Sequence, residues 1–325
     1  GSWAEFGTAQ QNALRMAREE HPELFINIDF IVEDCGHLGK EVMSAFQKLT
    51  AVDKVNAVFV WGVEPALIAA PVAEARKIPV IASAQAAPAS RGRKYVMRTL
   101  NYSEQYSEKL LEYFRTQSIK KIAIVQAEMS YYNLLIEGIR ANLDLDEQLE
   151  IIDNYPPSAA DFNTTIAKLK TRKFDALGLY LTPQQILEFY REAAAQNLHP
   201  FVFGTHPFQS KRIVADAGGL MSGAVYVHNI VTEDFYQRYT AKFSDDNQIP
   251  WAANAYDAAI LFGKLFNNLS PPPSSDRIIE MLSSIQPQEG AGGKYRFRET
   301  VEAGKFFEYP IGVFRIDGSK HRRVM

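Results

Sequence analysis

Short apolar runs rich in β-branched and aromatic residues alternate along this chain with longer segments in which apolar residues recur every three or four positions. The short runs are typical of buried strands, and the longer segments are typical of amphipathic helices. Strands that alternate with helices predict a mostly parallel sheet with helices on both faces, and therefore an α/β fold. The chain has 325 residues, which is more than one ordinary core needs and suits two lobes.

A first series of predicted elements runs from residue 9 to residue 99, and a second series follows it without a disordered linker. The predicted helices of the first series are 9–20, 40–49 and 65–76, and its strands are 25–33, 57–61, 78–82 and 95–99. The predicted helices of the second series are 103–116, 133–142, 161–171, 183–196 and a short one at 209–217, and its strands are 121–126, 150–155, 176–181, 201–203 and 224–227.

A tail completes the chain. It contains predicted helices at 232–243, 252–268 and 276–284, and we expect it to end in a β pair formed by 294–297 and 311–316. Two similar halves and a tail predict two doubly wound lobes, with a chain that crosses between them more than once. We assign residues 1–100 plus 231–303 to lobe one and residues 101–230 plus 304–325 to lobe two.

Composition and motifs exclude several classes of function. The formal net charge is −3 and no basic stripe is visible, which argues against a nucleic-acid partner. No apolar run approaches the roughly 18 residues that a membrane span needs. Cys35 is the single cysteine, so an intramolecular disulfide and a multi-cysteine metal site are excluded. Cys35 lies two positions from His37, but no nucleophile elbow, phosphate loop or metal-spaced histidine pair accompanies them, so we expect no enzyme, cofactor or metal.

Several stretches carry a resemblance to a known family. They are Gly1–Gly7 (GSWAEFG), Ile31–Cys35 (IVEDC), Val96–Thr99 (VMRT), Asp161–Phe162 and Ile311–Phe314 (IGVF). In this order and spacing, the chain resembles type I periplasmic solute-binding proteins of the branched-chain amino-acid (leucine/isoleucine/valine-binding) ABC transporter family. In that family a first strand would precede Gly1. The family's disulfide partner for Cys35 would fall at Gly62, so the crosslink is lost.

The resemblance implies a fold and a function. It implies two doubly wound, mostly parallel sheet lobes joined by a three-strand hinge, in a monomer that works in the periplasm or outside the cell. Such a protein captures a small-molecule ligand by hinge closure and delivers it to an ABC transporter permease. An alternative is a ligand-sensing domain that reports to a receptor or regulator, and an enzyme is a distant third.

In open α/β sheets, ligands bind beyond the carboxyl ends of the strands, near helix N-termini. That rule and the resemblance select the same loops. The candidate ligand-binding residues are Phe6, Trp61, Glu64, Ser83 and Gln85 in lobe one, Tyr131, Thr182 and His206 in lobe two, and Trp251 before a long helix.

Each candidate also has a structural interpretation. Trp61 ends a buried strand and could be core as readily as ligand wall, and Glu64 lies where a helix dipole favours a carboxylate in any case. Ser83 and Gln85 could hydrogen-bond their own backbone. Thr182 with the proline after it is typical of a helix N-cap.

The remaining candidates rest on alignment. Tyr131 aligns with a tyrosine of the family's cleft. His206 aligns with the acidic group that meets a ligand ammonium, although a surface histidine is the alternative. Trp251 could instead anchor its helix.

The residues that would hold an α-amino acid look altered. Val63 and Ala86 stand where the family carries a serine and a threonine that bind the ligand carboxylate, and His206 replaces the acid. A carboxylate would also be repelled by Glu64. We therefore expect a ligand other than a standard branched-chain amino acid, with a flat or apolar surface that lies against Trp61, Tyr131 and Trp251.

Overall fold

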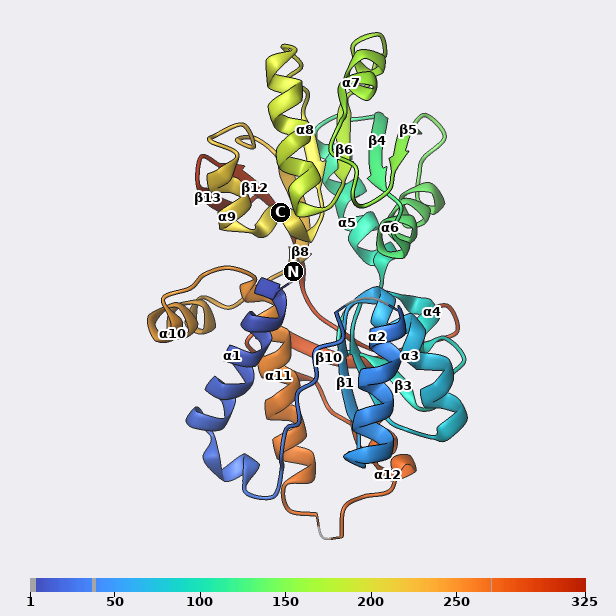
Figure 1. Cartoon of the computed structure of the whole chain (residues 1–325), viewed down its shortest axis with the longest axis vertical. Coiled ribbons are helices and arrows are strands. Elements are labelled where there is room, and N and C mark those ends of the chain that lie inside the picture. Colours follow the sequence, from blue (N-terminus) through green and yellow to red (C-terminus); the bar gives the residue numbers. More distant parts are fainter. Residues whose placement is uncertain (1–3, 37–38, 270) are drawn as a thin grey trace. The chain divides into compact units, whose positions relative to one another are not determined.

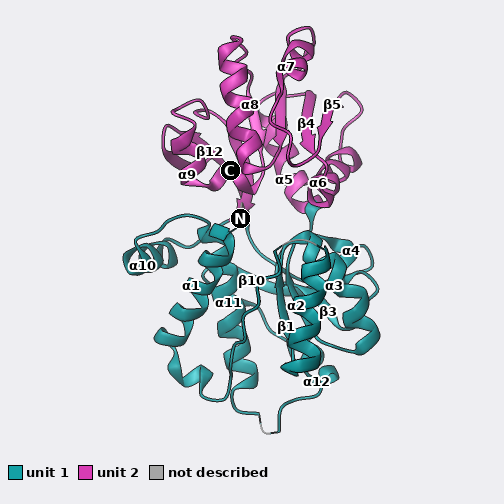
Figure 2. Ribbon diagram, viewed as in Figure 1, with its two compact units in different colours: residues 1–103, 230–310 teal, residues 104–229, 311–325 magenta. Residues whose placement is uncertain are grey.

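The computed structural model describes residues 4–36, 39–269 and 271–325. The chain forms two compact units (Figure 2). Unit 1 contains residues 1–103 and 230–310, and unit 2 contains residues 104–229 and 311–325. The chain therefore passes between the units three times. The predictions that concern Trp3 and His37 lie outside the described residues.

Unit 1 contains a six-stranded sheet in which the first four strands are parallel. Its strand order is β1-β2-β3-β11-β10-β9, and β10 is antiparallel to both of its neighbours. Strand β2 is buried along its whole length, whereas three of the four residues of β1 are only partly buried. The strands are β1 (Val58–Trp61), β2 (Val80–Ser83), β3 (Val96–Arg98), β9 (Gln288–Gly290), β10 (Gly293–Thr300) and β11 (Gly304–Glu308).

The helices of unit 1 come from both ends of its sequence. They are α1 (Ala4–Glu20), α2 (Gly39–Gln47), α3 (Val63–Arg76), α4 (Ala87–Ser90), α10 (Glu233–Phe243), α11 (Ile249–Phe266) and α12 (Ser275–Ser283), with short helical turns at Pro22–Phe25 and Lys48–Val52. Helices α1 and α11 lie side by side (Figure 1). Small side chains such as Ala13, Ala17, Ala252 and Ala255 are buried in the core that these helices share.

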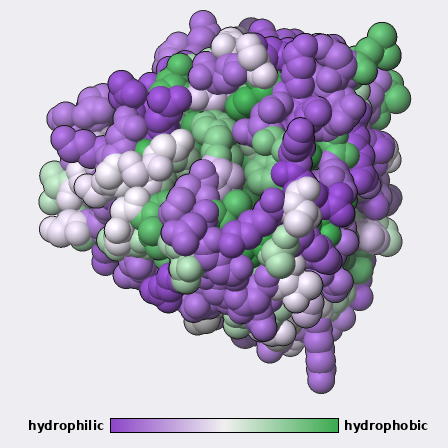
Figure 3. Space-filling model, turned by 90° about the horizontal axis from the view of Figure 1, so that it is seen from above, coloured by the Kyte–Doolittle hydropathy of each residue, from purple (hydrophilic) through white to green (hydrophobic). Residues whose placement is uncertain are grey.

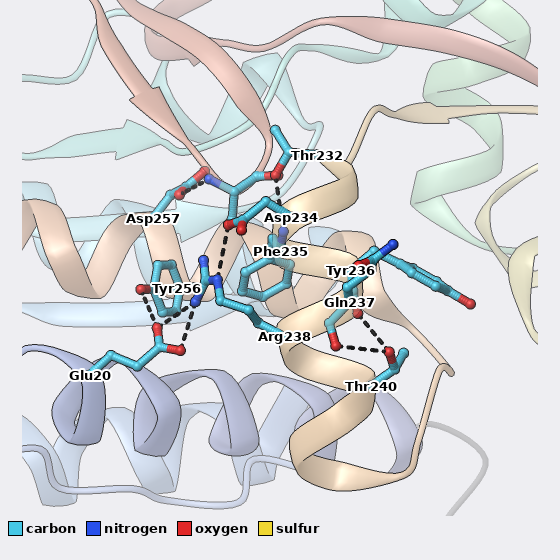
Figure 4. Close-up of polar contacts among 11 residues, drawn as sticks. Glu20, Thr232, Asp234, Phe235, Tyr236, Gln237, Arg238, Thr240, Tyr256 and Asp257 are labelled. Atoms are coloured by element: carbon cyan, nitrogen blue, oxygen red, sulfur yellow. Dashed lines mark hydrogen bonds and ion pairs between the residues drawn. The ribbon is translucent and has the colours of Figure 1, made fainter.

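A polar contact also joins the end of α1 to the middle of α10 and of α11 in unit 1. The Arg238 guanidinium of α10 lies 2.6 Å from the carboxylate of Glu20, which is the last residue of α1 (Figure 4). The Tyr256 hydroxyl of α11 donates to the same carboxylate at 2.6 Å. Segments that are more than 200 positions apart in sequence are therefore fixed to one another by charge and hydrogen bonding as well as by apolar packing.

Unit 2 contains a seven-stranded sheet of order β13-β12-β8-β7-β6-β4-β5. Strands β5, β4, β6, β7 and β8 are parallel, and β12 and β13 continue the sheet antiparallel. The strands are β4 (Lys121–Ala127), β5 (Gln148–Tyr155), β6 (Ala176–Tyr180), β7 (Val202–Gly204), β8 (Val225–Asn229), β12 (Ile311–Asp317) and β13 (Lys320–Arg323). The helices are α5 (Ser103–Thr116), α6 (Ser130–Ala141), α7 (Asn163–Lys170), α8 (Pro183–Ala195) and α9 (Lys211–Asp216), with a helical turn at His206–Gln209.

The predicted α/β fold with two mostly parallel sheets is confirmed, but two predictions about strands are wrong. Residues 25–33 form no strand, because 22–25 make a helical turn and 26–35 have no ladder partner among the described residues. Segments 294–297 and 311–316 do not pair with each other, since they belong to the sheets of different units. Residues 304–310, which the sequence analysis assigned to lobe two, lie in unit 1, where β11 pairs with β3.

The surface carries the polar and charged residues that the composition provides, 22% of the chain being charged. Hydrophilic side chains cover most of the face shown in Figure 3, and smaller hydrophobic areas lie between them. No helix in the described ranges is both long and apolar enough to cross a membrane.

Candidate functional site

In unit 1, two neighbouring parallel strands end beside each other at residues named by the sequence analysis. Trp61 ends β1 and is paired in register with Ser83, which ends β2. The next residue, Gly62, has φ 102° and precedes α3 directly, a backbone conformation that favours glycine. This turn places the first residues of α3, including Glu64, at the carboxyl edge of the sheet.

Three predicted site residues form one aromatic cluster at this edge. The ring centroids of Phe6 and Trp61 are 4.9 Å apart and stacked, and Trp251 meets Trp61 edge-on at 5.7 Å. Phe6 is 0% exposed and Trp251 is 3% exposed, whereas Trp61 is only partly buried. Phe6 and Trp251 therefore support Trp61 from inside unit 1, and Trp61 is the most exposed ring of the three.

Beneath this edge lies a buried polar network that the sequence analysis missed. The hydroxyls of Ser83 and Thr99 both donate to Asn254 Oδ1 at 2.7 Å, and Asn254 Nδ2 donates to the Thr99 carbonyl at 2.8 Å. All three side chains are buried. The Ser83 hydroxyl is thus engaged by its own unit, and the role of Ser83 and of buried Gln85 in ligand binding stays a prediction.

In unit 2, the strand order creates a topological switch point between β4 and β6. The chain leaves β4 toward β5 on one side and later returns to β6 on the other, which is the position where open α/β sheets bind ligands. Tyr131 and Tyr132 begin α6 just after β4, and the Tyr132 hydroxyl donates to the Leu181 carbonyl after β6 at 2.6 Å. The two loops that flank the switch point are therefore tied together.

Thr182 follows this loop and begins α8. Gln185 Oε1 accepts hydrogen bonds from the Thr182 backbone N–H and hydroxyl, each at 3.1 Å, within a capping box. Pro183 stands at the first helical position. The predicted capping role of Thr182 is confirmed, and any contact of Thr182 with a ligand stays a prediction.

Tyr131 and His206 come together in unit 2, as both site predictions require. Their ring centroids are 4.9 Å apart, and each residue is 7% exposed. Below Tyr131 is a cavity of about 10 Å³, which Thr205 lines and which has room for about one water molecule. Thr205 Oγ1 is buried and has no hydrogen-bond partner among the described residues, so this cavity suits a bound water and is too small for an organic ligand.

A larger hollow of about 170 Å³ lies elsewhere in unit 2. It is lined by Lys121, Gln148, Glu150 and Arg172, at the amino ends of β4 and β5. These strand ends face away from the switch point. Although this hollow is larger, it lies at the opposite end of the sheet from the carboxyl ends where ligands bind, so we do not assign the candidate site to it.

Asp257 is a second buried residue that the sequence analysis missed. It lies in α11, is 3% exposed, and accepts hydrogen bonds from the backbone N–H groups of Ala291 at 2.6 Å and Gly292 at 2.9 Å. Burial raises the pKa of Asp257 to about 7, although the two amide donors oppose that rise. A Cβ at Gly290 would lie 2.4 Å from the Asp257 carboxylate, so this turn requires glycine.

The same turn holds the second connection between the units on the unit 1 side. The Thr232 backbone N–H donates to the Ala291 carbonyl at 2.9 Å, and the Thr232 hydroxyl donates to it at 3.2 Å. The Tyr309 backbone N–H donates to Asn101 Oδ1 at 3.0 Å. Tyr309 lies beside the third connection, and Asn101 lies beside the first connection. Unit 1 therefore fixes its ends of all three connections.

Unit 2 fixes its ends of the connections in a similar way. The Tyr106 hydroxyl, near the first connection, donates to Asn229 Oδ1 at 2.6 Å. Asn229 is the last residue of unit 2 before the second connection. Ile311, the first residue after the third connection, is paired with Asn229 in the sheet. Next to Asn229, His228 is 2% exposed, and burial lowers its pKa to about 4.

Among the described residues, no group of three or more His, Cys, Asp or Glu side chains could hold a metal ion. Cys35 is a free, partly buried cysteine.

Two α/β units of this topology, joined by three connections, define the type I periplasmic binding protein fold. A sequence profile described as "Periplasmic binding protein" matches residues 1–320. The chain belongs to this periplasmic binding protein family. No curated protein sequence matches the chain significantly.

Solved structures agree with the fold. The leucine-binding protein LivK of Thermotoga maritima aligns with a TM-score of 0.87 at 17% identity, over 99% of this chain and 94% of its own. LivJ of Streptococcus pneumoniae, in complex with isoleucine, aligns with a TM-score of 0.85 at 18% identity, over 100% and 96%. An ABC transporter solute-binding protein of Rhodopseudomonas palustris BisB5, in complex with 3,4-dihydroxybenzoic acid, gives 0.82 at 20% identity, over 99% and 92%.

Proposed function

We propose that this protein captures a small organic solute between its two units, which close on the solute by bending at the three connections. The observation that carries the proposal is that each unit presents an aromatic ring at the carboxyl edge of its parallel sheet, Trp61 in unit 1 and Tyr131 in unit 2. A ligand that contacts both edges only in the closed state has a differential affinity for that state and shifts the equilibrium toward it.

The solute is not a standard branched-chain amino acid. Val63 and Ala86 carry no hydroxyl for a ligand carboxylate, and the Ser83 hydroxyl is already engaged by Asn254. His206 stands where an acidic partner for the ligand ammonium is expected. Proteins of this fold bind chemically different ligands, as the isoleucine and 3,4-dihydroxybenzoic acid complexes illustrate, so the fold itself permits another solute.

The protein works outside the cytoplasm as a monomer, releases the solute unchanged and delivers it to an ABC transporter permease. Support comes from the family and from the transporter-associated proteins that share the fold. Deleting the gene should abolish uptake of the identified solute. Unchanged uptake together with a lost transcriptional or behavioural response would instead indicate a sensory role.

The test is a thermal-shift screen of the full chain against amino acids, aromatic acids, amines and short peptides. A ligand at one hundred times its Kd should stabilise the protein by about 2.7 kcal/mol, and its binding should reduce the radius of gyration measured by small-angle X-ray scattering. Trp61→Ala and Tyr131→Ala should each abolish the shift.

Phe297→Ala is a matched control, because Phe297 is partly buried like Trp61 but lies on an antiparallel strand of unit 1. This variant should keep the shift. Stabilisation by leucine, isoleucine or valine that Tyr131→Ala removes would refute the proposed ligand class. If no compound of the panel stabilised the protein, the capture function itself would be refuted.

A further inference from the structure

Around Trp61, the hydroxyl donors already have hydrogen-bond partners inside the protein, whereas a carboxylate acceptor has an oxygen without one. The hydroxyl donors nearest the ends of β2 and β3 are those of Ser83 and Thr99, and both are committed to Asn254 Oδ1 at 2.7 Å. A ligand carboxylate at this edge would need such donors. Those two hydroxyls could serve it only by leaving Asn254 Oδ1 buried without them, which is unfavourable.

The opposite holds for the acceptor at this edge. Glu64 lies in the first turn of α3, three residues after Trp61, and its side chain is partly buried. Its Oε1 atom is enclosed by the protein and has no hydrogen-bond partner among the described residues. Leaving a buried acceptor unsatisfied costs free energy, and the cost is larger for a charged group. The Glu64 carboxylate is therefore left without a partner inside the protein at Oε1, and a rotation of this partly buried side chain would bring it to a donor from outside.

Two other features of this edge could favour an anion, and neither does so strongly. The N-terminus of α3 carries a positive partial charge, but Pro65 removes one of its free N–H groups, and the Glu64 carboxylate occupies the same turn. The Arg98 guanidinium is fully buried and donates to Ser90 Oγ at 2.9 Å and to the Ala303 carbonyl at 2.8 Å. Its donors are directed into unit 1. The Gln85 side-chain amide can donate or accept and does not decide the charge of a ligand.

Building on the capture function proposed above, we infer that the solute is an organic cation, an amine or amidine attached to a flat apolar group. The flat group lies against Trp61, whose position is held by Phe6 and Trp251. The cationic group pairs with the Glu64 carboxylate once the side chain has turned toward it. A cation is favoured over a neutral donor because it pairs with the carboxylate and is also attracted to an indole face.

The test compares probes of equal shape and opposite charge on the full chain. The pairs are phenethylamine with 3-phenylpropionate, tryptamine with indole-3-propionate, and benzamidine with benzoate, each titrated by calorimetry and thermal shift. At least one cation should bind, and its paired anion should bind at least tenfold more weakly, because a carboxylate would face Glu64. The neutral 3-phenylpropionamide should fall between the members of its pair.

Variants assign the charge preference to one residue. Glu64→Gln should weaken the bound cation at least tenfold, as expected for a hydrogen bond to a charged group, and the ligand-free variant should melt no lower than the parent protein. Glu104→Gln is the matched control, because Glu104 is also the second residue of its helix and also has an enclosed oxygen without a partner among the described residues, but it belongs to unit 2. This control should change cation affinity by less than twofold.

Each remaining outcome has a definite meaning. Preferential binding of the anions, or loss of cation binding in Glu104→Gln and not in Glu64→Gln, would overturn the assignment and leave solute capture intact. Binding of a different solute from the wider screen, with affinity that Glu64→Gln leaves unchanged, would do the same. If neither these probes nor the wider panel bound, solute capture would be refuted and the inference would fail with it.

Discussion

In unit 2 the first strand of the unit, β4, lies inside the sheet between β5 and β6, whereas in unit 1 the first described strand, β1, lies at the edge. The neighbouring segments of these two strands, residues 148–155 after β4 and residues 26–35 before β1, differ in whether they form a strand. Residues 148–155 form β5 because β4 lies beside them. Residues 26–35 have a comparable apolar pattern and form no strand, and Ile31 and Val32 are 47% and 55% exposed. A β pattern becomes a strand only where a partner satisfies its backbone.

The units also bury ionisable groups of opposite kind near the three connections. Unit 1 buries Asp257 beside the turn that holds Thr232, and unit 2 buries His228 next to Asn229. Burial disfavours the charged form of each group, so it raises the pKa of the acid and lowers the pKa of the base. The stabilities of the two units should therefore respond to pH in opposite directions.

The largest expected effect is in unit 1. The pKa of Asp257 rises from 3.8 to about 7 on folding, so between these values the folded state binds more protons than the unfolded state. Stability is then full below pH 3.8 and falls as the pH rises through 7, by about 4 kcal/mol. Urea unfolding followed by tryptophan fluorescence measures this, because Trp3, Trp61 and Trp251 all belong to unit 1.

Asp257→Asn is the control for that slope. It should be less stable at pH 4, since the amide group has one accepting atom for the two backbone N–H groups whereas the protonated carboxyl group has two oxygens. Its fluorescence-detected stability should be nearly flat from pH 4 to pH 7. A parent protein whose unit 1 gained stability over this range would contradict the assigned pKa direction.

A slightly smaller and opposite effect is expected in unit 2. The pKa of His228 falls from 6.5 to about 4 on folding, so stability is present above pH 6.5 and is lost as the pH falls through 4, by about 3 kcal/mol. The circular dichroism signal changes when either unit unfolds, whereas tryptophan fluorescence follows unit 1. A circular dichroism transition without a matching fluorescence transition therefore belongs to unit 2. The two transitions should separate on acidification, and His228→Gln should remove the acid-side loss. Transitions that coincide at every pH would mean that the units unfold as one.

The smallest expected effects compare two hydroxyls. Ser83→Ala should destabilise unit 1 by about 1 kcal/mol through the lost bond to Asn254. Thr182→Ala should destabilise unit 2 by about 1 kcal/mol through the lost helix cap. Urea titrations measure both changes. The affinity for a solute found in the screen tests the second role of each hydroxyl: an affinity loss without a stability loss would make the hydroxyl a ligand contact, and a stability loss with unchanged affinity would leave it a structural group only.

Local patterns predicted much of the fold. The apolar run at 57–61 became β1 at Val58–Trp61, and the Thr182-Pro183 pair began α8 as expected. Such features depend on residues close in sequence. Tyr131 and His206 were each predicted in loops at the carboxyl edge of the lobe-two sheet, and the structure places their ring centroids 4.9 Å apart.

Features that depend on distant segments were not predicted. Strand β11 is short and pairs with β3, about two hundred positions earlier in the chain, and the burial of Phe6 and Trp251 depends on how α1 meets α11. Asn254 and Asp257 did leave a signal, because they are polar residues within the apolar run 249–263. Their partners could not be identified without the structure.

The three connections between the units have a consequence for controlled cleavage. A single cut between residues 103 and 104 yields one fragment that contains β1, β2 and β3 and another that contains β9, β10 and β11. The β3–β11 ladder joins these fragments within one sheet. The second fragment keeps the other two connections, so its part of unit 1 stays covalently linked to unit 2. A protease nick at this point should therefore leave a complex that migrates as one species under native conditions and separates into two chains only in denaturant.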